Sequence, residues 1–149
     1  MWVVALIAAL EDILVGPYLH SFQQGLERAT TPAEKLAAVE AAIAKMRARG
    51  IRPLSAGGDH LCTLPILRGL AKGGAPLGLV HFDSHTDLFP AYFGSKIPTH
   101  GNPFRFAVDE GLLDPARMVQ IGIRGTQYDS TDRDFAREHG IRIITIEEC

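Results

Sequence analysis

The chain has 149 residues, a formal net charge of -2 at pH 7 and 46% hydrophobic residues. This length suits one domain of ordinary size, and the composition is that of a globular rather than a disordered protein. The basic residues are scattered, so the sequence shows no electrostatic footprint for nucleic acid. Cys62 and Cys149 form neither a CxxC pair nor a disulfide framework, which argues against a secreted, disulfide-stapled protein and for ordinary reduced thiols.

The apolar segment over residues 1–10 carries no basic residue before it and is followed by Glu11-Asp12. It is too short to cross a bilayer, because a membrane-spanning helix needs about 20 residues. We expect a first strand or a buried segment there, and a cytoplasmic protein with no membrane partner.

Strand and helix patterns alternate along the rest of the chain. Thr31-Pro32-Ala33-Glu34 combines an N-cap, a proline at the first helical position and a capping-box glutamate, and Gly50 ends this helix. We expect strands over residues 51–56, 77–82, 118–123 and 141–146, and helices over 63–72, 102–110 and 131–139. The alternation predicts an α/β fold, a parallel sheet with helices on both faces, in which the apolar strand 77–82 lies buried in the middle.

Two polar clusters follow strands, at the carboxyl ends where parallel α/β sheets build their sites. The first is Gly57-Gly58-Asp59-His60; the second contains Asp83, His85 and Asp87, which in an extended chain would all project to one side. Carboxylates buried together need a metal ion or hydrogen-bond partners, and oxygen ligands mixed with imidazole suit manganese, zinc or iron. His81 has the same parity, but a histidine deep in a strand is more often a core residue, so it is not taken as a ligand.

Together these motifs resemble the ureohydrolase family of arginase, agmatinase and guanidinobutyrase, and within it the agmatinase branch. The resemblance covers residues 52–148, whereas residues 1–30 match poorly. It rests on the segments 55–60, 80–87, 92–95, 99–101 and 120–125. It implies a truncated arginase-like fold of three layers, with residues 1–149 forming a single, incomplete domain that lacks the C-terminal half of the family.

The resemblance also implies a role for each matching residue. His60 and Asp87 would bind one manganese ion, His85 would bind a second, and Asp83 would bridge the two. A hydroxide held between the ions would attack the guanidinium carbon of the substrate. The leaving nitrogen needs a proton, which His100 or Asp87 would deliver as the catalytic residues.

The sequence also departs from the family pattern. The family completes its metal pair with a C-terminal Asp-x-Asp motif, and the run Asp132-Arg133-Asp134 does not replace it, because acidic residues in a first helical turn are explained by the helix dipole. We therefore expect the chain alone to bind manganese weakly and to release urea slowly or not at all. Leu61 removes a hydroxyl beside His60, Asp59 is expected to orient a ligand or the loop, and Asn102 is expected to cap the next helix.

The loop over residues 88–99 lies between the metal cluster and His100, so we expect it to line the substrate pocket. It is apolar and aromatic, with Leu88, Phe89, Pro90, Tyr92 and Phe93. This favours agmatine, hydrolysed to putrescine and urea, over arginine. Lys96 would instead meet the carboxylate of a guanidino acid if the protein is a guanidinobutyrase or a relative, although most lysines are simply exposed.

Alternatives to an active ureohydrolase stay open from the sequence. One is a truncated, inactive member of the family that binds metal or pairs with intact subunits, and another is an unrelated α/β metal-binding domain. If the family resemblance holds, the partners are a small cationic guanidine and, for the full-length protein, further copies of itself in a homo-oligomer.

Overall fold

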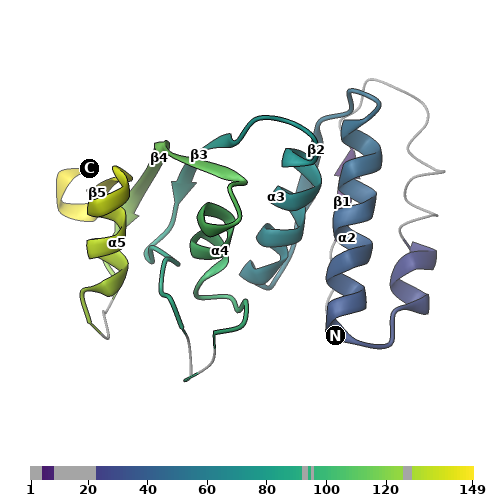
Figure 1. The fold of residues 1–149 in the computed structure, drawn as a ribbon, viewed down its shortest axis with the longest axis horizontal. Coiled ribbons are helices and arrows are strands. Elements are labelled where there is room, and N and C mark those ends of the chain that lie inside the picture. Colours follow the sequence, from purple (N-terminus) through teal and green to yellow (C-terminus); the bar gives the residue numbers. More distant parts are fainter. Residues whose placement is uncertain (1–4, 9–22, 92–93, 95, 126–128) are drawn as a thin grey trace. The chain divides into compact units, whose positions relative to one another are not determined.

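The computed structural model describes residues 5–8, 23–91, 94, 96–125 and 129–149. They fall into two compact units, Met1–Lys72 and Gly73–Cys149 (Figure 1). Most of the segment 1–10, and Tyr92, Phe93 and Ser95 of the predicted pocket loop, lie outside the described residues. The prediction of a single, incomplete domain over residues 1–149 stays a prediction.

The first unit is built on a packed pair of helices. A helical segment over residues 23–28 precedes α2 (Pro32–Arg47), and η1 (His60–Cys62), a short 3-10 helix, leads into α3 (Thr63–Ala71). The predicted start of α2 is confirmed, since Thr31 accepts from Glu34 N and the Glu34 side chain returns the bond. The core residues Val39, Ile43 and Met46 of α2 pack with Ile66 and Leu70 of α3.

The strands of the first unit run in a direction that the alternation does not predict. β1 (Ala5–Ala8) and β2 (Pro53–Ala56) form an antiparallel pair, with Ala5 opposite Ala56. Antiparallel pairing departs from the parallel arrangement of a strand-helix-strand unit.

The second unit is a parallel sheet flanked by helices, which confirms the predicted α/β class. Its strands are β3 (Leu77–Phe82), β4 (Leu113–Ile123) and β5 (Arg142–Thr145), in the order β3-β4-β5 and all parallel. The helices α4 (Pro103–Asp109) and α5 (Thr131–His139) both pack against β4, and η2 (Ile146–Glu148), a 3-10 helix, ends the chain (Figure 1). Each predicted element of this unit is present, with bounds that differ by a few residues.

β3 differs from its prediction in its surroundings. Among the described residues of the second unit, β3 pairs with β4 alone, so it lies at the edge of this sheet rather than in its middle. Side chains alternate between the two faces of a strand. Val80 and Phe82, at 61% and 74% exposure, therefore lie on the face opposite the buried His81.

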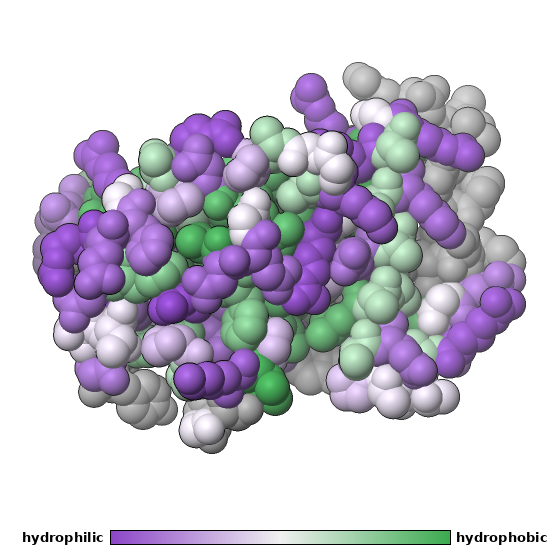
Figure 2. Space-filling model, viewed as in Figure 1, coloured by the Kyte–Doolittle hydropathy of each residue, from purple (hydrophilic) through white to green (hydrophobic). Residues whose placement is uncertain are grey.

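Apolar residues reach the surface among hydrophilic ones on the face drawn in Figure 2. Over the whole surface of the described residues, the large exposed hydrophobic side chains are Leu54, Val80, Phe82, Ile97 and Ile146. Within the described ranges, none of the helices combines the length and the apolar character that a bilayer span requires.

Candidate metal centre

Asp83 is the first residue after β3, and its backbone still continues the sheet. Its N–H donates to Ile121 O of β4 at 3.2 Å, after which residues 83–85 bend away. The bend is stabilised by the Asp83 side chain itself, because His85 N and Ser84 Oγ donate to Asp83 Oδ1 at 3.0 and 3.3 Å. The chain is therefore not extended over residues 83–87. The alternation of side chains between the two sides, which was expected to continue there, ends at Phe82.

Asp87 is held in a backbone conformation that few residues adopt. Its φ of 53° is positive, and its side chain is buried at 7% exposure. Aspartate and asparagine tolerate this left-handed region better than other residues with a side chain. The preceding residue is fixed from two sides, since Thr86 Oγ1 donates to Asp132 Oδ2 at 2.5 Å and Thr86 O accepts from Gln120 Nε2 at 2.7 Å.

His81 lies on β3, two residues before Asp83, and its ring is next to the Asp83 carboxylate. Its Nε2 is 3.5 Å from Asp83 Oδ2, its Nδ1 is 3.2 Å from Gln120 Nε2, and its ring meets Phe104 edge-on at 4.5 Å between centroids. The sequence treats it as a core residue, and it is indeed buried and hydrogen-bonded. It also contacts a carboxylate of the predicted metal cluster, which the sequence alone does not show.

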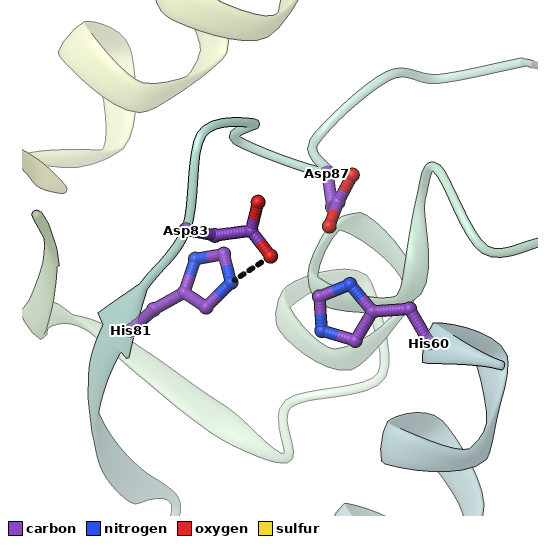
Figure 3. A group of neighbouring side chains, drawn as sticks. All are labelled: His60, His81, Asp83 and Asp87. Atoms are coloured by element: carbon purple, nitrogen blue, oxygen red, sulfur yellow. Dashed lines mark ion pairs between the residues drawn. The ribbon is translucent and has the colours of Figure 1, made fainter. Parts of the chain in front are cut away.

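The second unit thus gathers two carboxylates and an imidazole. One ligand atom from each of His81, Asp83 and Asp87 lies within 4.8 Å of the others (Figure 3). Two like charges at that separation repel by about 3.5 kcal/mol at an effective dielectric constant of about 20. A divalent cation would reverse this repulsion, and carboxylate oxygens are donors that manganese, iron and zinc accept. The two carboxylates therefore fit a metal ion, with the His81 ring beside Asp83.

His85 lies apart from this group. Its side chain is 60% exposed, and its Nδ1 is 3.0 Å from Ser84 Oγ and 3.6 Å from Asp83 Oδ1. Gly125 passes close by, since a Cβ added there would lie 2.8 Å from His85 Nε2 and 3.0 Å from Ser84 O. The position of the ring thus depends on a glycine 40 residues further along the chain, and the ligand role of His85 stays a proposal.

His60, also drawn in Figure 3, belongs to the first unit. It is half-buried and begins η1, whose start is capped by Asp59 Oδ1 accepting from Leu61 N at 2.7 Å. Asp59 therefore orients the turn that carries His60. Burial, and secondarily the charge of Asp59, raise the pKa of the nearby Cys62 thiol, so this cysteine is the less reactive, protonated form at neutral pH.

His100 is exposed on a turn that Asn102 stabilises. Asn102 Oδ1 accepts from Thr99 N at 2.6 Å and from Thr99 Oγ1 at 3.2 Å, and its Nδ2 donates to Ile97 O at 3.3 Å. Asn102 was expected to cap α4, but its side chain makes no cap hydrogen bond. It is fully buried and its bonds are directed to the turn before the helix instead.

The described part of the pocket loop departs from expectation at one residue. Leu88 has 0% exposure, so it belongs to the core and cannot line a pocket. Phe89 is half-buried, and Pro90 and Lys96 are exposed.

The sequence analysis assigned no role to Gln120 and explained Asp132 by the helix dipole alone. Asp132 is 3% exposed and bonded to Thr86, so the helix dipole does not account for it. Gln120 is 0% exposed in the middle of β4, and a polar residue inside an otherwise apolar strand is the signal that points to it.

Comparison with known proteins places this geometry in a family. A model of the arginase family matches residues 8–149. The chain belongs to the arginase family. It is 55% identical to the guanidinopropionase of Pseudomonas aeruginosa over 115 residues, which are 77% of this chain and 36% of that protein. It is 50% identical to the mitochondrial agmatinase of Gallus gallus over 105 residues, 70% of this chain and 31% of that protein.

The fold agrees with solved members of the family. The crystal structure of a Trypanosoma cruzi formiminoglutamase variant with Mn²⁺ matches with a TM-score of 0.68 at 25% identity, over 80% of this chain and 40% of that one. The predicted family and the arginase-type fold are thereby confirmed. The arginase-family chain described here spans about a third of the length of the curated relatives it matches.

Proposed function

We propose that the protein hydrolyses a linear guanidino compound to urea and an amine at a manganese centre. The observation that carries the proposal is the close approach of Asp83 and Asp87 at the carboxyl end of β3. Both curated relatives described above are named for guanidino substrates, and a structural relative contains Mn²⁺.

Asp83 and Asp87 would hold the metal, with His60 and His85 as further ligands according to the family motif. A bound divalent ion supplies a Lewis acid that lowers the pKa of water toward neutrality. The bonds from His85 N and Ser84 Oγ hold the Asp83 carboxylate in one orientation before any metal arrives. The guanidinium carbon is otherwise a poor electrophile because its positive charge is delocalised, so the attacking water would need activation by the metal.

His100 would hold a proton for the leaving nitrogen. His100 is exposed, and the buried Asn102 fixes the backbone around it through bonds to residues 97 and 99. Protonation of the departing amine prevents its return to the carbon and completes the hydrolysis.

Two substrate classes are supported by different observations. The apolar loop over residues 88–99 favours agmatine, which has no carboxylate. The 55% identity to a guanidinopropionase favours a guanidino acid, whose carboxylate the exposed Lys96 would meet. We propose agmatine first, with guanidino acids such as 3-guanidinopropionate and 4-guanidinobutyrate as the alternative.

The test is manganese binding and urea release by the full-length protein. Wild-type protein should bind Mn²⁺ in a titration followed by electron paramagnetic resonance, and should release urea from one of the three guanidines. Asp83→Asn and Asp87→Asn should lose both, because each removes a charged ligand. His139→Asn is the matched control, since His139 lies on α5 with its Nδ1 on Phe135 O. Urea release that survives Asp83→Asn would contradict the proposal.

A further inference from the structure

Gln120 and His81 are neighbours across β3 and β4. They are register partners in the parallel ladder, and both are buried, at 0% and 7% exposure. Gln120 Nε2 lies 3.2 Å from His81 Nδ1 and 2.7 Å from Thr86 O. A side-chain amide nitrogen carries two hydrogens, so a single Nε2 can donate to both partners.

Thr86 O decides which way the Gln120 amide points. A carbonyl oxygen only accepts, so the amide atom that faces it must be the nitrogen, and the flipped amide would bring two oxygens together. With the nitrogen placed there, its second N–H faces His81 Nδ1. That ring nitrogen must then accept, which excludes a proton on it.

The tautomer of His81 follows from this constraint. A neutral imidazole carries one proton, and with Nδ1 accepting, the proton is on Nε2. Nε2 is the atom that lies 3.5 Å from Asp83 Oδ2. The N–H of His81 therefore faces the carboxylate. In the other tautomer a lone pair would face it and would repel its negative charge.

We propose that Gln120 is a positioning residue for the metal centre. One amide acts on both carboxylates: it sets the His81 tautomer that supports Asp83, and it ties down the carbonyl directly before the left-handed Asp87. The inference rests on the proposed function in so far as these two carboxylates hold the metal. Residues that orient ligands in this way typically change metal affinity by about 10- to 100-fold when they are removed.

The first test uses metal-free full-length protein labelled with ¹⁵N-histidine. Long-range ¹H–¹⁵N correlation spectra distinguish the two neutral tautomers. Wild-type His81 should show the proton on Nε2, and Gln120→Leu, which keeps the volume but removes the donor, should lose this single tautomer. A wild-type spectrum with the proton on Nδ1 would overturn the proposal.

The second test measures Mn²⁺ affinity alongside stability. Gln120→Leu should weaken Mn²⁺ binding at least about tenfold. Met118→Ala is the matched control, because Met118 is a buried residue of the same strand, at 3% exposure, whose register partner is Leu79. It should lower the unfolding midpoint and leave the affinity unchanged. Equal affinity losses in the two variants, or none in Gln120→Leu, would refute the positioning role. If wild-type protein binds no Mn²⁺, the proposed function fails, and the tautomer spectra alone decide on Gln120.

Discussion

Thr86 donates a 2.5 Å hydrogen bond to Asp132, although the two residues lie 46 positions apart in the chain. The bond joins the loop after β3 to the first turn of α5. Asp132 is buried, and its other oxygen accepts from Arg133 N at 2.8 Å. The helix α5 thus fixes the residue directly before Asp87, one of the two proposed carboxylate ligands.

Replacing Thr86 by valine should destabilise the protein by about 1.5–3 kcal/mol, the usual range for a hydrogen bond to a charged group. Valine has nearly the same shape as threonine but no hydroxyl, so Asp132 Oδ2 loses this donor. The measurement is the free energy of unfolding in urea at pH 7, followed by circular dichroism.

The control for this prediction is Ser130→Ala. Ser130 Oγ donates to Asp134 Oδ2 at 2.6 Å, which is the same chemistry at an exposed position of the same helix start. Water replaces the lost donor there, so the loss should stay below about 1 kcal/mol. If both variants lose the same free energy of unfolding, burial does not explain the contribution of the Thr86–Asp132 bond to stability.

Gly69→Ala should destabilise the packing of α2 against α3. A Cβ at Gly69 would lie 2.7 Å from Ile43 Cβ and 2.8 Å from the backbone oxygen of Glu40, so the helices would have to separate. Overpacking of this kind costs about 1–3 kcal/mol, which outweighs the gain of about 1 kcal/mol in helix propensity except at the lower end of that range. We expect a net loss, because a backbone atom cannot move aside cheaply.

Gly57→Ala serves as the control, since a Cβ at Gly57 meets nothing within 4 Å. Thermal unfolding midpoints of the two variants should differ clearly, with Gly69→Ala the lower. A Gly69→Ala protein as stable as wild type would show that α2 and α3 are not packed as closely as described.

The capping box of α2 predicts a pH dependence of stability. Bonds from the backbone of Thr31 and Thr30, and then from the Thr30 and Thr31 hydroxyls, lower the pKa of Glu34 from 4.5 to about 2. A lowered pKa means that the folded state prefers the ionised carboxylate. Its stabilisation is therefore fully present above pH 4.5 and is lost as the pH falls toward 2.

Glu34→Gln should remove this dependence. The variant should be less stable than wild type at pH 7, and the two should converge as the pH falls through the interval from 4.5 to 2. Urea denaturation midpoints measured across that interval test the prediction. Parallel curves for the two proteins would show that the carboxylate does not titrate with folding.

Gly125→Ala should displace the His85 ring and weaken metal binding, with some loss of stability because the added Cβ would also lie 3.0 Å from the backbone oxygen of Ser84. The added methyl group would contact His85 Nε2 at 2.8 Å, and an exposed ring can swing away at small cost. If His85 is a ligand, Mn²⁺ affinity should fall at least about tenfold. The affinity of Gly125→Ala combined with His85→Ala should equal that of His85→Ala alone, because the glycine acts through the ring. Additive losses would contradict this.

The features that the sequence predicted well are those with contiguous signals. The N-cap, proline and glutamate at Thr31–Glu34 lie within one turn, and the apolar run of β3 is bounded by glycine and polar residues, so α2 and β3 begin where expected. The two carboxylates after β3 were singled out by their residue types, and they do lie close together. Their geometry was not predicted, because the alternation of an extended strand was carried past Phe82 into a bend.

Contacts between distant segments account for what the sequence did not reveal. No local pattern pairs Thr86 with Asp132, or Gln120 with His81, since each contact depends on the register of β3 on β4 or the placement of α5. The antiparallel direction of β1 against β2 is also a relationship between distant segments that no local pattern indicates. The alternation of elements predicted parallel strands, whereas β1 and β2 pair antiparallel.

The positive φ of Asp87 restricts which residue types can occupy that position. Glutamate binds metals as readily as aspartate, but its longer side chain gains no local bond that compensates for a left-handed backbone. Asparagine adopts the conformation and lacks the charge, while glycine adopts it and lacks the ligand altogether. Aspartate alone combines an anionic oxygen with this turn of the chain, so the shape of the loop, as much as the metal, selects the residue.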